Sequence, residues 1–401
     1  MRVLFVNHTS AASGAEVALM RLVKEVQREH RVAVACPPGG PLAKVVDEAA
    51  VERISVSAFD ASLRLHPVQT PVKLLSLGSG GVALARAARV FGADVLHANT
   101  PRAGLMASLA SRQHGIPLVV RAHEHIPDTA VGRVVSTALS RSANAILTVS
   151  QETARRFNEA FDRPLATHVY NSFDRKRFDP SRVPAAGIRE ELGIPAGLPL
   201  LGHIAQITPW KAQDTSIRAL AGLLELGLDA HLLIVGGIAF DGKGVRYDNH
   251  GYLATLQRLV GTLGIEDRVH FLGQRADVPG IIQDIDLSLL PSWDEPFANV
   301  MLESMAMKTP LLVSNVGGGP ELVEDGVSGR LLPPRRPEVW ASAAHDLLAD
   351  RPALERMGER AQRATDSFSD EVHARAMVDV YEHVIAHPEH GPAEIAAALH
   401  A

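Results

Sequence analysis

The chain has 401 residues, which at about 150 residues per domain predicts two or three domains. Hydrophobic residues make up 46% and charged residues 21%, a globular balance that excludes a disordered or fibrous chain. The single cysteine, Cys36, excludes internal disulfides and multi-cysteine metal sites, and every apolar run is too short for a membrane-spanning helix. The N-terminal MRVLFVNH is interpreted as a first strand rather than a signal peptide, so a cytoplasmic enzyme is expected.

The net charge of −5 is unevenly distributed, with +7 in residues 1–180 and −12 in the remainder. The segment Ala61–Ala93 has no carboxylate but contains Arg64, Lys73, Arg86 and Arg89. Such a basic half suits an anionic membrane surface or a phosphorylated acceptor, and a solvated helix face is the alternative. Nucleic acid is not an expected partner, because no recognisable binding module accompanies the charge.

Strands alternate with helices in the first half of the chain. Amphipathic stretches such as Glu16–Glu29 and Gly104–His114 separate short apolar runs rich in β-branched residues. These predicted strands are Val3–Val6, Val32–Ala35, Asp94–His97, Leu118–Arg121 and Ala145–Val149. Apolar strands alternating with helices are typical of a parallel sheet covered on both faces.

A charged, Pro- and Gly-bearing stretch, RKRFDPSRVPAAG, follows Asn171 and is interpreted as a linker. The alternation then restarts with Leu200–Ala205, His231–Gly236, Val269–Leu272, Leu287–Leu290 and Pro310–Ser314. We therefore predict an α/β protein with two doubly wound domains, over residues 1–180 and 181–370. Residues 371–401 are expected to be helices that return to the first domain, with a weakly anchored tail from His387. The polar insertion Asp241–Tyr252 is either a lid or a plain surface loop.

The densest group of polar residues is the stretch Pro291–Glu303, which follows a predicted strand and opens a helix. Glu295 and Glu303 are eight residues apart, one before the helix and one inside it. Two carboxylates placed in this way can bind hydroxyls of two sugars on one ligand, while the backbone N–H groups of Asn299 and Val300 point at an anion between them. The alternative is a helix with one surface Glu and one capping Glu.

Other polar residues follow the strands of the first half. The loop from Asn7 to Glu16 leads into a helix and suits a phosphate, with Glu16 expected to cap that helix. His97, Asn99 and His123 lie at strand ends, and the sequence His-Glu-His at 123–125 lacks the spacing of a helical zinc motif.

At the Glu295–Glu303 stretch the chain resembles the retaining glycosyltransferases of family 4, which have the GT-B fold of two Rossmann-like domains facing across a cleft. The stretch looks like the glutamate–seven–glutamate motif of that family. The resemblance covers almost the whole chain and continues through the motifs Ile207–Asp214, Arg268–Gly273, Ser304–Pro310 and Val316–Val323.

The resemblance implies roles for individual residues. Glu303 is expected to bind the ribose hydroxyls of a nucleotide, Glu295 the hydroxyls of the donor sugar, and Lys211 the diphosphate. His123 is expected near the donor sugar and the reacting bond. Further donor contacts are expected from Gln206, Phe297, Asn299, Val300, Gly14, Gly273 and Arg275. Acceptor contacts are expected from His97, Asn99 and Ser13.

Departures from the family pattern affect three of these regions. Gln206 stands where the family usually has an Arg, so one cation for the leaving diphosphate is replaced by a neutral donor. Pro296 has no N–H to donate to a ligand. Lys308 replaces a Gly that supplies a positive φ, so local backbone strain is expected there. The acidic pair Asp284 and Asp286 resembles the metal-binding motif of another glycosyltransferase fold, but it precedes a strand and is expected to end a helix.

The resemblance thus implies a metal-independent, retaining glycosyltransferase that needs no cofactor. It would move a sugar from a nucleotide-diphosphate sugar, with a UDP-sugar favoured, to a small or lipid-linked acceptor. Peripheral contact of the first domain with the inner face of a membrane is a further expectation. Two alternatives stay open: a sugar-nucleotide epimerase of the same fold, and a catalytically inactive nucleotide-binding scaffold, which the Gln206 substitution keeps open.

Overall fold

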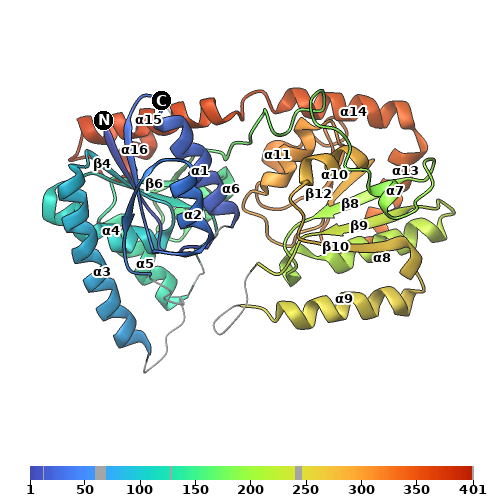
Figure 1. Ribbon diagram of the computed structural model, residues 1–401, viewed down its shortest axis with the longest axis horizontal. Coiled ribbons are helices and arrows are strands. Elements are labelled where there is room, and N and C mark those ends of the chain that lie inside the picture. Colours follow the sequence, from blue (N-terminus) through green and yellow to red (C-terminus); the bar gives the residue numbers. More distant parts are fainter. Residues whose placement is uncertain (12, 59–68, 127–128, 240–245, 400–401) are drawn as a thin grey trace. The chain divides into compact units, whose positions relative to one another are not determined.

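The computed structural model describes residues 1–11, 13–58, 69–126, 129–239 and 246–399, with the side chains of residues 69–78 not described. The chain divides into two compact units. Unit 1 consists of residues 1–172 and 370–401, and unit 2 of residues 173–369 (Figure 1).

Unit 1 contains a parallel sheet with the strand order β3-β2-β1-β4-β5-β6-β7. Its strands are β1 (Arg2–Val6), β2 (Arg31–Cys36), β3 (Glu52–Ser55), β4 (Val95–Ala98), β5 (Leu118–Ala122), β6 (Ala145–Thr148) and β7 (Thr167–His168). Its helices are α1 (Gly14–Val26), α2 (Gly40–Glu48), α3 (Gln69–Phe91), α4 (Pro101–His114), α5 (Ala130–Ser140), α6 (Gln151–Glu159), α15 (Asp370–Ala386) and α16 (Pro392–Ala398).

Alternate residues of the unit 1 strands pack into two separate cores. Leu4 and Val6 of β1 face the core under α3, α4 and α5, whereas Val3 and Phe5 face the core under α1, α2, α15 and α16. The red C-terminal helices lie against the blue N-terminal elements (Figure 1). The sheet is therefore buried on both faces, and one of its layers comes from the end of the chain.

Unit 2 contains a second parallel sheet with the order β10-β9-β8-β11-β12-β13. Its strands are β8 (Leu200–Ile204), β9 (His231–Val235), β10 (Val269–Gly273), β11 (Leu287–Leu290), β12 (Leu311–Ser314) and β13 (Arg330–Leu332). Its α-helices are α7 (Ile188–Glu191), α8 (Gln213–Glu225), α9 (Asn249–Leu263), α10 (Val278–Asp284), α11 (Asn299–Ala306), α12 (Gly319–Leu322), α13 (Pro337–Ala349) and α14 (Arg351–Ala364). The short 3-10 helices are η1 (Pro209–Lys211) and η2 (Glu266–Arg268).

The boundary expected at residue 180 lies earlier in the structure, between Ser172 and Phe173. Phe173 is buried, and its N–H donates to the carbonyl of Phe368 at 3.2 Å. The stretch interpreted as a linker is also packed, because Phe178 is buried and the N–H of Ala186 donates to Gly280. These residues therefore belong to unit 2 rather than to a free linker.

The apolar strands expected from the sequence are present, but three edge strands were missed. β3, β7 and β13 are short or partly polar, so they contain no continuous apolar run. Of the insertion expected over Asp241–Tyr252, residues 241–245 lie outside the described residues. The remainder enters α9, because Asp248 caps this helix by accepting from the N–H of Gly251 at 2.9 Å.

Lys308 adopts the left-handed conformation expected for its position, with φ 61°. Its carbonyl oxygen lies so close to Gly358 of α14 that a Cβ there would stand 2.1 Å away. The Lys backbone is therefore strained at the end of α11, since L-residues pay roughly 1–2 kcal/mol in this region.

The tail, expected to be weakly anchored, is instead packed through α16. Ile395 is fully buried in the core that also holds Tyr381 of α15. The side-chain amide of Asn144 donates to the carbonyls of Pro388 and His390 at 2.9 and 3.0 Å. The tail thus belongs to the core of unit 1.

We predict that Ile395→Ala lowers the free energy of unfolding by about 2–5 kcal/mol, because it leaves a cavity in that core. The matched control is Val90→Ala, which truncates a side chain that is 84% exposed and should change stability by less than about 0.5 kcal/mol. Urea unfolding followed by circular dichroism measures both. A loss below about 1 kcal/mol for Ile395→Ala would contradict the packed tail.

Candidate active site

The polar residues of unit 2 gather where its sheet reverses direction. β8 and β11 are neighbours in the sheet although they are not consecutive along the chain. Lys211 follows β8 and Glu295 follows β11, so the reversal brings both residues to the carboxyl edge. Ligands of open parallel sheets bind at this point.

Lys211 and Glu295 form an ion pair with 2.5 Å between Lys211 Nζ and Glu295 Oε2. Their side chains are only 13% and 7% exposed. Ser292 donates its hydroxyl to the same carboxylate oxygen at 2.9 Å, and the ammonium lies 4.1 Å from the centre of the Trp210 ring. The largely buried ion pair is thus stabilised by the Ser292 hydroxyl at the carboxylate and by the Trp210 ring at the ammonium.

The backbone around this pair is constrained. Ala212, which follows Lys211, has φ 57° and is fully buried. Gly317 has φ 57°, and a Cβ there would stand 1.9 Å from the carbonyl oxygen of Glu295. The N–H of Gly318 donates to that same carbonyl at 2.9 Å. Strained residues and close backbone contacts of this kind gather at functional sites.

A buried histidine lies beneath Lys211. His203 of β8 bonds through Nδ1 to the hydroxyl of Ser216 at 2.8 Å. Burial, and secondly the charge of Lys211, lowers the pKa of His203 to about 3. His203 is therefore neutral in the working pH range and adds no positive charge beside Lys211.

Gln206, which stands where an Arg is usual in the family, lies two residues after the end of β8. Its backbone carbonyl accepts from the side-chain amide of Gln213 at 2.9 Å. Gly236 has φ 139° and approaches the carbonyl of Ala205 so closely that a Cβ there would stand 2.0 Å away. The Gln206 loop is thus fixed through its backbone.

The predicted helix of the two-glutamate motif is α11, which begins at Asn299. Glu295 precedes it and Glu303 lies inside it, as expected, and Phe297 between them is buried. No side chain caps the helix, whose N-cap is Ala298. The first amides of α11, including those of Asn299 and Val300, therefore point along the helix axis towards the carboxyl edge of the sheet.

Gly273 ends β10 with φ 64°, and its carbonyl accepts from the N–H of Gly236. The guanidinium of Arg275 binds Glu191 at 3.0 and 3.2 Å and Asp277 at 2.9 and 2.8 Å. These hydrogen bonds raise the pKa of Arg275. A ligand contact at this loop is therefore expected through the backbone rather than through the guanidinium.

In unit 1 the sheet reverses between β1 and β4. Asn7 follows β1, Asn99 follows β4 and His123 follows β5. The side-chain NH₂ of Asn7 donates to the Glu16 carboxylate at 3.2 Å. The side-chain NH₂ of Asn99 donates to Asn7 Oδ1 at 3.1 Å. Asn99 Oδ1 in turn lies 3.1 Å from His123 Nε2. A hydrogen-bonded chain thus leads from the Glu16 carboxylate to His123.

The hydrogen bonds between Glu16 and His123 all run in one direction. A carboxylate only accepts, so Asn7 must present its NH₂ group to Glu16 and its oxygen to Asn99. Asn99 in turn presents its oxygen to His123, so His123 donates through Nε2. Burial, together with Arg121 and His97, lowers the pKa of His123 well below its usual value. His123 is therefore neutral and offers Nδ1 as an acceptor.

The loop before α1 is organised by Glu16, which caps the helix as expected. Its carboxylate accepts from the N–H and the hydroxyl of Ser13, at 2.9 and 2.5 Å, and is itself buried. Gly14, the first residue of α1, is exposed. Gly14 and the half-buried Ser13 thus lie at the helix N-terminus, close to the start of the chain that leads to His123.

The expectation that His97 lines an acceptor pocket does not fit the structure. His97 is fully buried, its Nδ1 bonds to the Tyr381 hydroxyl at 2.7 Å, and its ring packs on Phe5. The strand alternation turns it into the core beneath α15. Asn99, only 1% exposed, acts through His123 and Asn7 in this conformation.

Asp284 and Asp286 have structural contacts, as expected. Asp284 ends α10 and accepts from the N–H of Ile188, and Asp286 accepts from Arg189 at 2.6 Å. Among the residues that the structure describes, one group of at least three His, Cys, Asp or Glu residues suits a metal ion, and it lies at residues 387–390 of unit 1.

Asn7 and Ser292 are site residues that the sequence analysis missed. Asn7 directly follows β1 and Ser292 lies two residues after β11, each at the point where its sheet reverses. A position just after a strand was the signal in the sequence. It distinguishes a site residue only when the strand order shows that the sheet reverses at that strand.

The chain matches two family models. One is described as "Glycosyltransferase Family 4" and matches residues 12–177, and the other as "Glycosyl transferases group 1" and matches residues 186–364. The boundary between them falls close to the junction of the two units.

Curated relatives match over most of the chain. A D-inositol 3-phosphate glycosyltransferase of Stackebrandtia nassauensis is 30% identical over 340 residues, which cover 79% of this chain and 75% of the relative. A protein of the same name from Nocardia farcinica is 30% identical over 306 residues, which cover 72% of this chain and 66% of that relative.

Solved structures share the fold. The crystal structure of Anabaena HepE in complex with UDP-glucose superimposes with a TM-score of 0.81 and 26% sequence identity. The match covers 96% of this chain and all of HepE.

We predict that Asn99→Asp raises the pKa of His123, because it places a carboxylate beside Nε2–H and stabilises the imidazolium. NMR titration of labelled histidines measures this, with the His123→Gln spectrum assigning the resonance. In the unsubstituted protein His123 should stay neutral as the pH falls through about 6.5, the usual pKa of histidine. Titration of the unsubstituted residue near that value would disprove the neutral, oriented imidazole.

Proposed function

Because the chain belongs to glycosyltransferase family 4 and has the GT-B fold, we propose that it transfers a sugar from a nucleotide-diphosphate sugar to an acceptor hydroxyl with retention of anomeric configuration. The observation that carries this proposal is the buried Lys211–Glu295 pair at the reversal point of the unit 2 sheet. A cation and a carboxylate at one point match the two needs of the donor, whose diphosphate is anionic and whose sugar presents hydroxyls.

A UDP-sugar is the first donor candidate. HepE, which has the same fold and 26% identity, was crystallised with UDP-glucose. In this chain Glu303 would bind the ribose hydroxyls, and the amides that open α11 would face the diphosphate. Phe297 would pack within the motif loop, and the loop of Gly273 and Arg275 would contact the base through its backbone.

The ion pair sets the order of events at the donor site. With no donor bound, Glu295 neutralises Lys211. An incoming diphosphate competes for the ammonium and releases the carboxylate to accept from the sugar hydroxyls. Lys211 then opposes the negative charge that grows on the leaving diphosphate. Gln206 adds a neutral hydrogen bond where a second cation is usual, so Lys211 carries more of this stabilisation.

Retention follows if the leaving phosphate takes the proton of the acceptor hydroxyl on the same face of the sugar. The motifs contain no obvious side-chain nucleophile. A neutral His123 would accept a hydrogen bond from a donor sugar hydroxyl at Nδ1 and so orient the sugar. The reaction as proposed requires no metal ion.

A phosphorylated polyol is the first acceptor to test. The curated relatives carry the name D-inositol 3-phosphate glycosyltransferase. In unit 1, Arg102 in the first turn of α4 is close enough to His8 to contribute, after burial, to lowering its pKa to about 4. Arg102 lies in the first turn of α4, and Ser13 and Gly14 lie at the N-terminus of α1, where an acceptor phosphate would meet a cation and helix N-termini.

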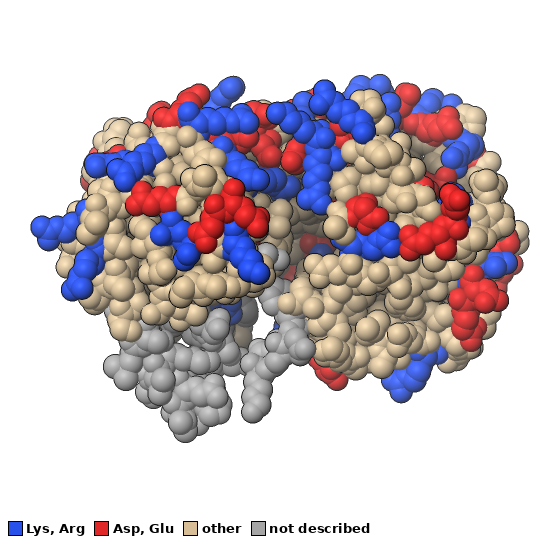
Figure 2. Space-filling view, in the orientation of Figure 1, with Lys and Arg blue, Asp and Glu red and all other residues tan. Residues whose placement is uncertain are grey.

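Lipid-linked acceptors form the second class to test. Residues 61–68 of the carboxylate-free segment lie outside the described residues, but Arg86 and Arg89 are exposed on α3 beside exposed Val82 and Val90. Within the described residues no helix is long and apolar enough to span a membrane. On the face shown in Figure 2, acidic side chains lie beside basic ones. Membrane contact would then be peripheral, and this part of α3 is the first surface to test.

The first experiment is thermal stability with UDP, GDP and ADP in excess EDTA, with Glu303→Ala as the control. A ligand at 100 times its dissociation constant stabilises by about 2.7 kcal/mol. A shift for one nucleotide that the control loses supports the donor site and identifies the base. Product masses then separate the alternatives, since transfer gives a heavier acceptor, an epimerase gives an isomeric donor, and an inactive scaffold gives neither.

We predict that Lys211→Ala lowers kcat by about 10²–10³-fold, the usual cost of losing one preorganised charge-stabilising donor. Steady-state kinetics with the identified donor measure the loss. Lys176→Ala, which removes an exposed lysine, is the matched control and should leave kcat unchanged. A loss below about tenfold for Lys211→Ala would overturn the assigned role.

A further inference from the structure

The end of α15 carries a histidine cluster for which the proposed glycosyl transfer has no use. His383 lies in the last turn of α15, and His387 continues that turn, since its N–H donates to the His383 carbonyl at 2.9 Å. Residues four apart on a helix share one face. The next turn, closed by the N–H of His390 on the His387 carbonyl at 3.0 Å, brings His390 and Glu389 to the same place.

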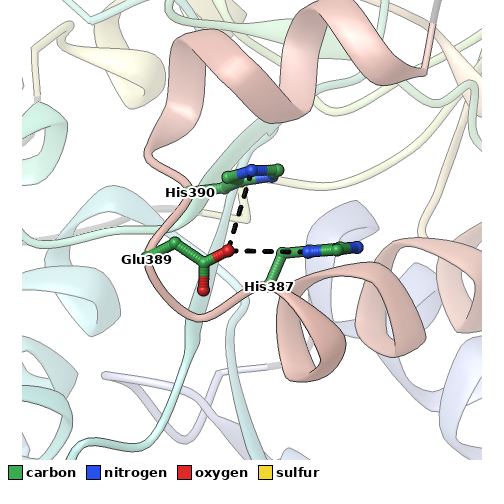
Figure 3. Close-up of side chains that lie close together, drawn as sticks. All are labelled: His387, Glu389 and His390. Carbon is green, nitrogen blue, oxygen red and sulfur yellow. Dashed lines mark ion pairs between the residues drawn. The ribbon is translucent and has the colours of Figure 1, made fainter.

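The three side chains lie close together, with the rings of His387 and His390 stacked at 4.8 Å between their centres beside the Glu389 carboxylate (Figure 3). Glu389 Oε1 lies 3.5 Å from His387 Nδ1 and 3.8 Å from His390 Nε2. All three ligand atoms lie within 4.8 Å of one another. The ligands of a tetrahedral zinc ion, at about 2.0–2.1 Å from the metal, are separated by about 3.3 Å, so the spacing already suits an ion and rotation of one of the two stacked rings would turn its nitrogen towards it.

His383 supplies a third imidazole beside His387, Glu389 and His390. Its ring centre lies 5.0 Å from that of His387 and 5.8 Å from that of His390. Its Nε2 is shielded from solvent and has no hydrogen-bond partner among the described residues. The cluster therefore combines three imidazoles and one carboxylate, a ligand set that suits borderline divalent transition metals rather than Mg²⁺ or Ca²⁺.

The backbone holds the cluster in place. The side-chain amide of Asn144 donates to the carbonyls of both Pro388 and His390, so the turn is tied to the residue that precedes β6. The C-terminus of α15 adds the negative end of a helix dipole, which favours a cation. The side chains are nevertheless accessible to an ion, with 47% exposure for His387 and 36% for His390.

We propose that His387, Glu389 and His390 form a binding site for a divalent transition-metal ion of the zinc class. The ion joins the end of α15 to the start of α16 and so fixes the C-terminal layer of unit 1. The site lies at the amino edge of the sheet, whereas His123 and Asn99 lie at the carboxyl edge. Its role is therefore structural and separate from sugar transfer.

The test uses the full chain after treatment with EDTA and removal of the chelator. Calorimetric titration with Zn²⁺ should give one ion per chain, and Zn²⁺ but not Mg²⁺ should raise Tm. The double variant His387→Gln/His390→Gln should bind Zn²⁺ at least about tenfold more weakly and lose the rise in Tm. Its Tm without metal should match that of the unsubstituted chain, which shows that it folds.

The matched control is His345→Gln, which removes a half-exposed histidine 3.6 Å from the carboxylate of Asp346 outside the cluster. This variant should keep the affinity and the rise in Tm. Equal Zn²⁺ binding by the double variant and the control would show that the metal sits elsewhere and would overturn the proposal. Absence of Zn²⁺ binding to the unsubstituted chain would do the same.

Discussion

Each sheet of this protein reverses its winding direction next to its first strand, and the arrangement of the candidate site residues within each unit depends on this constraint. All strands run parallel, so every carboxyl end lies at one edge. At the reversal the loops after neighbouring strands turn to opposite faces and leave that edge open. Unit 1 places Asn7 beside Asn99 there, and unit 2 places Lys211 beside Glu295. The same topology, used twice, thus yields an oriented neutral imidazole and a buried ion pair.

The candidate site residues of the two units use charge differently. In unit 2 opposite charges are paired, so that a ligand can exchange partners with them. In unit 1 a single carboxylate, that of Glu16, fixes the direction of every hydrogen bond as far as His123, while burial keeps the histidines uncharged. Paired ions and neutral imidazoles are two solutions to the same problem, which is to place polar groups at low exposure without leaving a charge unpaired.

The sequence predicted what local patterns encode. Apolar strands, the start of α11, the Glu16 cap and the strained Lys308 were all recognised from residue type and spacing. Edge strands such as β7 were missed because they contain no apolar run. His97 was misplaced because its partner, Tyr381, is 284 residues away and only the fold brings them together. The packed tail was missed for the same reason, since the alanine-rich sequence of α16 does not show where Ile395 is buried.

The return of the C-terminal helices to unit 1 has a consequence for synthesis of the chain. Unit 2 is one continuous segment, and its two ends meet where Phe173 bonds to Phe368. Unit 1 lacks Met377, Tyr381 and Ile395 of its core until residues 370–401 have been made. During translation, unit 1 therefore keeps one face of its sheet incompletely covered until residues 370–401 have been made. Unit 2, although its segment begins later, has all of its core residues before unit 1 does.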